Sequence, residues 1–206
     1  MTSIIEIGVD RIAEYASIPS RLLVRSKLDL FLMERGLGGM ILQEVPVDPP
    51  YFKDYDSFGE LPTDWPNKFD VRNWGFFLAT DGALWVGAAA VAFDTTGVFM
   101  LEARRDLAVL WDIRVVPQAQ GRGVGRMLFE QAVLWSRLRG CTQMKIETQN
   151  VNVPACRFYH HMGCQLGEIH RFGYAAVPHV AQEVMLNWYF TISEDLEDGN
   201  RQFEVK

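Results

Sequence analysis

The 206-residue sequence lacks several features that would place it in other protein classes. Its longest apolar run, residues 82–93, is shorter than the roughly 20 residues that a membrane-spanning helix needs. Its N-terminus has no basic stretch followed by an apolar core, so we expect no secretory signal and a cytoplasmic protein. The three cysteines, Cys141, Cys156 and Cys164, cannot all pair and lack metal-ligand spacing, which predicts buried thiols and no metal site.

Positive charge is also scarce. The chain has 20 Lys and Arg against 26 Asp and Glu, for a net charge of −6, and so has no electrostatic basis for binding nucleic acid. An acidic surface would instead attract a cationic small molecule. The composition, 49% hydrophobic and 22% charged, is that of a globular domain with a sizeable core.

A glycine-rich segment, 117–126, lies between an apolar stretch and an amphipathic one. Strand, turn and helix in this order present backbone N–H groups and the positive end of a helix dipole to an anion. The glycines permit a tight turn and close approach to a pyrophosphate, and the arginines add full charges. These residues are Gly121, Arg122, Gly123, Gly125 and Arg126. The segment lacks the Gly-Lys-Ser/Thr of a P-loop, and a turn that merely ends a strand is the alternative.

A second segment, 147–163, completes a resemblance to the GNAT (GCN5-related N-acetyltransferase) superfamily. Gln120-x-x-Gly123-x-Gly125 resembles its acetyl-CoA pyrophosphate loop. Asn152-x-x-Ala155-x-x-Phe158-Tyr159, with Met162-Gly163, resembles its second cofactor segment. Within the superfamily, Glu147-Thr-Gln-Asn-x-Asn152 and Pro50-Tyr51-x-Lys53-x-Tyr55 look like the streptothricin acetyltransferases.

The resemblance implies a single α/β domain over residues 1–192. Its fold would be a mixed, mostly antiparallel sheet flanked by helices. Two parallel strands, containing Ile113 and Ile146, would splay apart to form the cofactor cleft. Residues 1–74 would form the acceptor side and 75–192 the acetyl-CoA-binding core, followed by a polar tail over 193–206.

The residues themselves predict the individual elements. Residues 1–45 read as a strand, a short helix and a further strand, and 47–74 as an ordered, aromatic-rich loop that forms an acceptor pocket or a plug over the core. Asp81-Gly82 between apolar runs predicts a hairpin. The remaining expected elements are strands at 107–116, 144–148 and 183–189 and helices at 122–139 and 154–162. The expected apolar side of the first helix comprises Val124, Met127, Leu128, Ala132, Leu134 and Leu138.

Most of the cofactor contacts that the resemblance implies use the backbone. The backbone of Ile113 and Val115 would pair with the pantetheine arm like an added strand. Asn152 would hydrogen-bond that arm from the other side. The full expected acetyl-CoA set is Ile113, Arg114, Val115, Gln120, Gly121, Arg122, Gly123, Val124, Gly125, Arg126 and Asn152.

Acetyl transfer from a thioester to an amine requires the loss of a proton from the amine and its gain by the departing thiolate. The resemblance assigns the role of general acid to Tyr159. The alternative is that this side chain only packs against the helix. The resemblance assigns the base to Glu147, which could instead orient the amine or pair with Lys145 or Arg114. A covalent route through Cys156 with its neighbouring histidines is less favoured than a buried thiol and a solvated histidine pair.

The acceptor side departs from the family pattern. The resemblance implies carboxylates where this chain has Trp111 and His170, and their loss weakens the case for a polycationic antibiotic. Trp111 could instead stack on a flatter or less charged acceptor. The expected acceptor contacts are Tyr51, Trp111 and His170. Asp112 is expected to face away from Trp111, because neighbours on a strand point to opposite sides. The expected function is acetyl transfer from acetyl-CoA to a small-molecule amine, with a streptothricin-type antibiotic as one candidate. A protein lysine or N-terminal acetyltransferase and a non-catalytic acyl-CoA sensor stay open as alternatives. A homodimer through residues 184–190 is also open, although a core strand explains that segment as well.

Overall fold

The computed structural model describes residues 2–58 and 61–192, so the tail expected over 193–206 lies outside the described residues. The strands are β1 Thr2–Ile7, β2 Arg21–Met33, β3 Gly39–Asp54, β4 Gly75–Asp81, β5 Leu84–Phe93, β6 Leu107–Val115, β7 Gln143–Gln149, β8 Gln165–His170 and β9 Met185–Thr191. The α-helices are α1 Ile12–Ala16, α2 Trp65–Lys68, α3 Val124–Arg137 and α4 Val153–His161. Short 3-10 helices span Val9–Arg11, Glu34–Gly36, Tyr55–Phe58, Pro62–Asp64, Val71–Asn73, Phe99–Leu101 and Pro117–Ala119.

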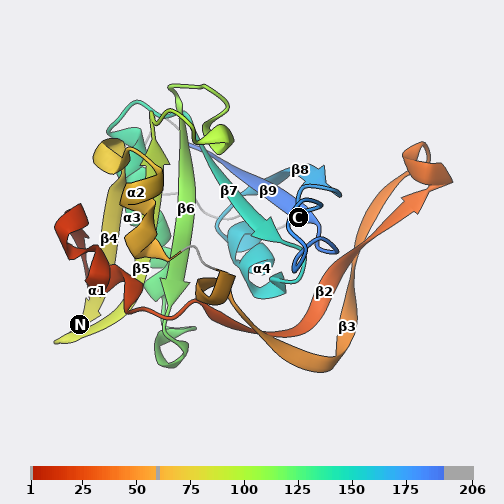
Figure 1. The fold of residues 1–206 in the computed structure, drawn as a ribbon, viewed down its shortest axis with the longest axis horizontal. Coiled ribbons are helices and arrows are strands. Elements are labelled where there is room, and N and C mark those ends of the chain that lie inside the picture. The colour runs from red at the N-terminus through yellow and green to blue at the C-terminus, as the bar shows by residue number, and fades with distance from the viewer. Residues whose placement is uncertain (1, 59–60, 193–206) are drawn as a thin grey trace, which may run out of the picture.

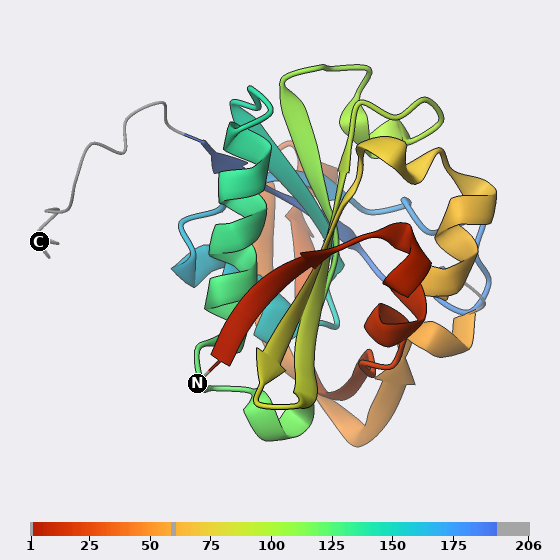
Figure 2. The same cartoon turned by 90° about the vertical axis from the view of Figure 1, so that its left-hand side faces the viewer.

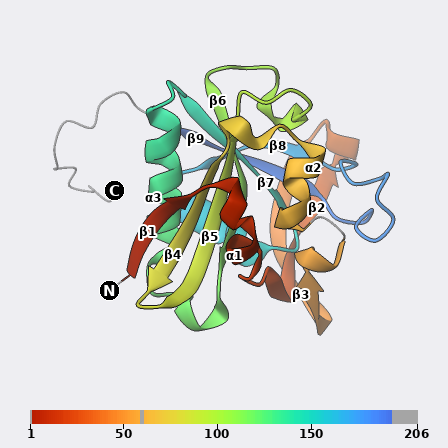
Figure 3. The same ribbon diagram turned by 60° about the vertical axis from the view of Figure 1, so that its left-hand side comes forward.

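Seven of the described strands form one sheet in the order β1-β4-β5-β6-β7-β9-β8 (Figure 1). Among these described strands, β6 and β7 form the parallel pair and the other neighbours are antiparallel. Helix α3 covers one face, and α1 and α2 cover the other (Figures 2 and 3). Each face has its own apolar cluster, one centred on Phe77 and Leu128 and one on Tyr15 and Leu78. The expected fold class is therefore confirmed.

Helix α3 packs its apolar side differently from the expectation. Val124, Leu128 and Ala132 are buried as expected, and Trp135 continues their line at helical spacing. Leu134 and Leu138 lie off this line and are exposed, so their assignment to the buried side was wrong. Gly140, with φ of +77°, takes the left-handed conformation just after the helix, as the sequence indicates.

A β-bulge in β6 overturns one expectation about the acceptor side. Ala90 pairs with Asp112 and Val91 with Leu110, so Trp111 is an extra residue in β6. Beyond the bulge the alternation is reversed: Ile113 packs with the Leu128 cluster, whereas Asp112 hydrogen-bonds Tyr15 on the other face. Trp111 also packs on the Tyr15 side. Trp111 and Asp112 therefore face the same way, and the prediction from simple alternation was wrong.

Strands β2 and β3 form a long two-stranded arm that extends away from the main sheet (Figure 1). The middle of β2 is tied to the body by two hydrogen bonds between Leu28 and Asn150, of 2.8 and 2.9 Å. The segment expected to be a loop over 47–74 begins as strand, because β3 continues to Asp54. Trp65 and Trp74 then bury their rings in the Tyr15 cluster.

The last strands differ in one respect from the expectation. Strand β8 was not foreseen, and it forms the edge of the sheet beside β9. Strand β9 is hydrogen-bonded to β7 on one side and to β8 on the other. The apolar segment 184–190 is accordingly a core strand, which was the alternative to a dimer contact.

Candidate active site

The parallel strands β6 and β7 separate soon after they meet. Among the described residues their pairing runs from Leu107 with Gln143 to Val109 with Lys145. Beyond this point β6 still pairs with β5, through Ile113 with Ala89 and Val115 with Gly87. The edge of β6 that faces β7 is thus left for an extended guest, as the pantetheine arm would require. Gln120 donates from Nε2 to the Val115 carbonyl at 3.1 Å and lies at the end of this edge.

The turn after β6 has the backbone of an anion cradle. Gly121 and Gly123 have φ of +73° and +86°, and no atom lies within 4 Å of the position of an added Cβ at either. Gly123 is the N-cap of α3, whose first turn carries no acidic residue. The first N–H groups of a helix have no intrahelical partner, so they are available to a pyrophosphate. The donor set and the open space therefore fit acetyl-CoA.

The two arginines and the third glycine of this segment lie in different surroundings. Arg122 is exposed and pairs with Asp81 at 3.1 Å, and Arg126 is exposed. Gly125 lies inside α3, where an added Cβ would be 3.6 Å from Phe158. That distance is an ordinary contact; Gly125 has helical backbone and does not form part of the tight turn, which corrects the sequence interpretation on this point.

Arg114 does not direct its side chain to the cofactor cleft. Its guanidinium is buried on the Tyr15 face, where it pairs with Asp112 at 2.8 Å and Asp56 at 3.1 Å. It also donates to the Ile18 carbonyl at 2.9 Å. The bulge at Trp111 explains this orientation, and only the backbone of Arg114 lies along the cofactor edge.

Helix α4 carries two of the expected site residues. Asn152 is its N-cap, and its Oδ1 accepts from the Ala155 N–H at 3.2 Å. Tyr159 is 5% exposed. Burial, followed by the negative charge of Asp112, raises the pKa of the Tyr159 phenol far above its usual value. The phenol is therefore a neutral proton donor across the physiological range.

Glu147 lies on β7 within a network of hydrogen bonds. Tyr174, from the loop between β8 and β9, donates to Glu147 Oε1 at 2.7 Å. Lys145 pairs with Glu102 at 2.7 Å and with Glu168 at 3.7 Å, so the suggested pairing partners of Glu147 are engaged with other acids.

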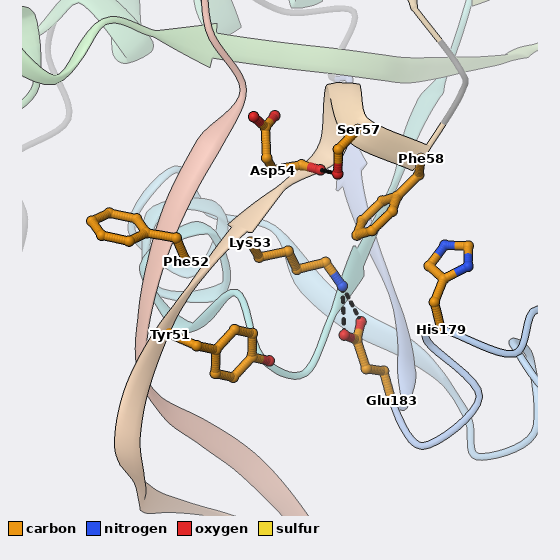
Figure 4. Close-up of a pocket in the computed structure, with 8 residues that line it drawn as sticks. All are labelled: Tyr51, Phe52, Lys53, Asp54, Ser57, Phe58, His179 and Glu183. Carbon is orange, nitrogen blue, oxygen red and sulfur yellow. Dashed lines mark hydrogen bonds and ion pairs between the residues drawn. The ribbon is translucent and has the colours of Figure 1, made fainter.

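The three expected acceptor contacts lie in different surroundings. Tyr51 lines a hollow of about 330 Å³ in which Lys53, 3% exposed, is paired with Glu183 (Figure 4). Trp111 packs against Phe69 and Trp74, with ring centroids 5.2 and 5.1 Å away. His170 is exposed at the end of β8.

Several residues near the site were not foreseen. Tyr15 donates to Asp112, and the pair sits beside Arg114 and Asp56. These residues come from distant parts of the chain, and the bulge that assembles them has no sequence signal. Tyr174 likewise stands in a segment without periodicity.

The cysteines match the expectation of buried thiols. Burial raises the pKa of Cys156 to about 12 and that of Cys164 to about 12. A thiol with so high a pKa is a poor nucleophile at neutral pH, which argues against a covalent route.

The chain is similar to proteins of a known family. The model of the Acetyltransferase (GNAT) family matches residues 41–164, more than half of the chain. The chain belongs to this family. A streptothricin acetyltransferase of Escherichia coli is 30% identical over 181 residues, covering 88% of this chain and 91% of the relative. One of Streptomyces lavendulae is 35% identical over 127 residues, covering 61% of this chain and 62% of the relative.

Solved structures share the fold of this GNAT protein. The crystal structure of nourseothricin acetyltransferase has a TM-score of 0.71 at 22% identity and covers 93% of this chain and 99% of its own. A Bacillus anthracis str. Ames protein crystallised with acetyl coenzyme A also has a TM-score of 0.71, at 23% identity, with 94% and 98% covered. The protein is thus an acetyl-CoA-dependent N-acetyltransferase. No described helix is long and apolar enough to span a bilayer.

Proposed function

We propose that this protein transfers the acetyl group of acetyl-CoA to a primary amine of a cationic small molecule, with a streptothricin-type antibiotic as the leading candidate. The observation that carries the proposal is a buried, neutral Tyr159 on α4 together with Glu147 on β7, beside strands that separate after Val109. The resemblance to the Escherichia coli streptothricin acetyltransferase over most of both chains supports the acceptor class.

When bound, acetyl-CoA supplies an activated thioester. The free edge of β6 and the first turn of α3 hold and orient it. Glu147 takes the proton that the attacking amine loses, and Tyr159 gives its proton to the sulfur that departs as CoA. Burial, followed by the charge of Asp112, raises the pKa of the Tyr159 phenol and keeps it protonated until then.

The acceptor side carries several carboxylates that suit a cation. Asp112 and Asp56 share the single guanidinium of Arg114, which leaves one negative charge in that group. The side chains of both acids are 22% exposed. Asp112 thereby provides, on the face of Trp111, a carboxylate that the sequence analysis did not place there.

The test is CoA release from acetyl-CoA with streptothricin, aminoglycosides, polyamines and lysine-containing peptides as acceptors. Turnover on a cationic small molecule, reduced strongly in Tyr159→Phe and Glu147→Gln, is the expected result. Loss of activity in Asp112→Asn with an active Glu147→Gln would transfer the role of base to Asp112. Binding of acetyl-CoA without turnover on any amine would favour a sensor.

A protein acceptor is the second candidate. A [Ribosomal protein bS18]-alanine N-acetyltransferase of Salmonella typhimurium is 29% identical over 122 residues, covering 56% of this chain. Turnover on peptides and not on small amines would favour this function.

A further inference from the structure

A chain of hydrogen bonds connects the start of α4 to Glu147. Asn152 donates from Nδ2 to the Tyr55 hydroxyl at 3.2 Å, and Tyr55 donates to Gln149 Oε1 at 2.8 Å. Gln149 then donates from Nε2 to the Tyr174 hydroxyl at 3.1 Å, and Tyr174 donates to Glu147 Oε1 at 2.7 Å. The members come from the helix cap, the segment after β3, strand β7 and the loop between β8 and β9.

Every hydrogen bond in this network has the same donor-to-acceptor direction, from Asn152 towards Glu147. The Asn152 Oδ1 accepts from the Ala155 N–H, which fixes the amide so that its Nδ2 faces Tyr55. A phenol has one proton, and Tyr55 uses it on Gln149 as Tyr174 uses its own on Glu147. The last donor therefore meets a carboxylate, and such a bond is stronger than one between neutral groups.

Tyr174 is well suited to be this last donor. It is 8% exposed, and burial, followed by the charge of Glu147, raises the pKa of its phenol far above the usual value. It consequently stays protonated at neutral pH and can donate to Glu147. Its loop is held to the body by the buried pair of Glu183 and Lys53 (Figure 4).

We infer that Tyr174 is a positioning residue that holds the Glu147 carboxylate in its anionic form and in one orientation. Through Gln149, Tyr55 and Asn152 that orientation is set by the N-terminus of α4, the helix that carries Tyr159. One short helix thus places both the acid and the base. The inference rests on the proposed function, because it takes Glu147 as the base.

The test is the pH dependence of kcat for Tyr174→Phe, with the acceptor found in the amine panel. Loss of the donor raises the pKa of Glu147, so the acidic limb of kcat should move up by about one pH unit, with about a tenfold loss of kcat below it. Among the described charged groups nearby, Lys145 lies two residues away on the same strand and pairs with Glu168, and Glu183 acts on Tyr174; this substitution leaves all three in place. The KM for acetyl-CoA should not change.

Tyr189→Phe is the matched control, because Tyr189 also donates to a carboxylate, Glu102, at 3.0 Å, but away from Glu147. The acidic limb of the pH profile of kcat should stay in place in Tyr189→Phe. In a Glu147→Gln background, Tyr174→Phe should have no further effect on kcat if it acts through Glu147. An unmoved acidic limb in Tyr174→Phe, or an additive loss in the double variant, would overturn the inference. Full activity of Glu147→Gln would instead remove Glu147 from the proposed mechanism.

Discussion

Removing one partner of the buried ion pair of Lys53 and Glu183 should be strongly destabilising. Lys53 Nζ contacts both carboxylate oxygens of Glu183, and the two side chains are only 3% and 12% exposed. The ammonium also lies 5.3 Å and 5.4 Å from the ring centroids of Tyr55 and Phe58. Lys53→Met keeps most of the apolar stem but leaves Glu183 without its ammonium.

Breaking a buried pair on one side costs about 3–5 kcal/mol, because a desolvated charge loses its partner. The remaining exposure of Glu183 puts the expected loss near the lower end, at about 3 kcal/mol. For a chain of this size that loss corresponds to a fall of about 6–12 °C in Tm. Urea unfolding followed by tryptophan fluorescence measures the free energy directly.

The matched control is Arg157→Met, which removes the cation from an exposed pair with Glu44, with side chains 65% and 36% exposed. It should cost no more than about 1 kcal/mol. The double variant Lys53→Met/Glu183→Leu should recover most of the stability, because both charges are then absent. The reasoning is refuted if Lys53→Met is no less stable than Arg157→Met, or if the double variant is less stable than Lys53→Met.

Three further predictions concern the cofactor side and the thiols. Tyr159→Phe should lower kcat by about 10²–10⁴-fold at pH 7 with little change in the KM for acetyl-CoA, as steady-state kinetics would measure. Gly123→Ala should lose about 1–2 kcal/mol of stability, because its φ is positive, and should raise the KM for acetyl-CoA. The control Gly82→Ala, with φ of +64° in the hairpin turn, should lose similar stability but leave this KM unchanged. Cys156 and Cys164, with pKa values near 12, should react with iodoacetamide at pH 8 only after unfolding, and rapid labelling of the native protein would contradict their burial.

The turn after β6 and helix α4 were largely predictable because both are local in sequence. Gly121 and Gly123 do form the tight turn that the glycines predict, each with a positive φ. Helix α4 lies where it was expected, with Asn152 as its N-cap and Tyr159 two turns later. Backbone groups of contiguous residues form this half, so a few glycines and one cap indicate it without any knowledge of distant contacts.

Residues 47–54 show where composition misleads. Pro49 and Pro50 made this segment read as a loop, yet it is part of β3. Within the described residues β3 pairs only with β2, so one of its edges has no strand partner. A proline that cannot donate is tolerated on such an edge, and a single sequence does not indicate in advance which strand will be an edge.

The acceptor side depends on side chains that the fold brings together from far apart, and one extra residue decides how they face. With regular alternation, Asp112 and Arg114 would lie on the face of the Leu128 cluster, and Ile113 and Val115 would face Tyr15. The bulge at Trp111 reverses this arrangement, and it thereby supplies Tyr15 with its carboxylate and the Leu128 cluster with two apolar side chains. Position-by-position reading therefore places Trp111 and Asp112 on opposite faces, whereas the folded strand presents both on the same face. Removing Trp111 would restore the alternation and place the Arg114 guanidinium against an apolar core, so the bulge is required for both the acceptor side and the packing.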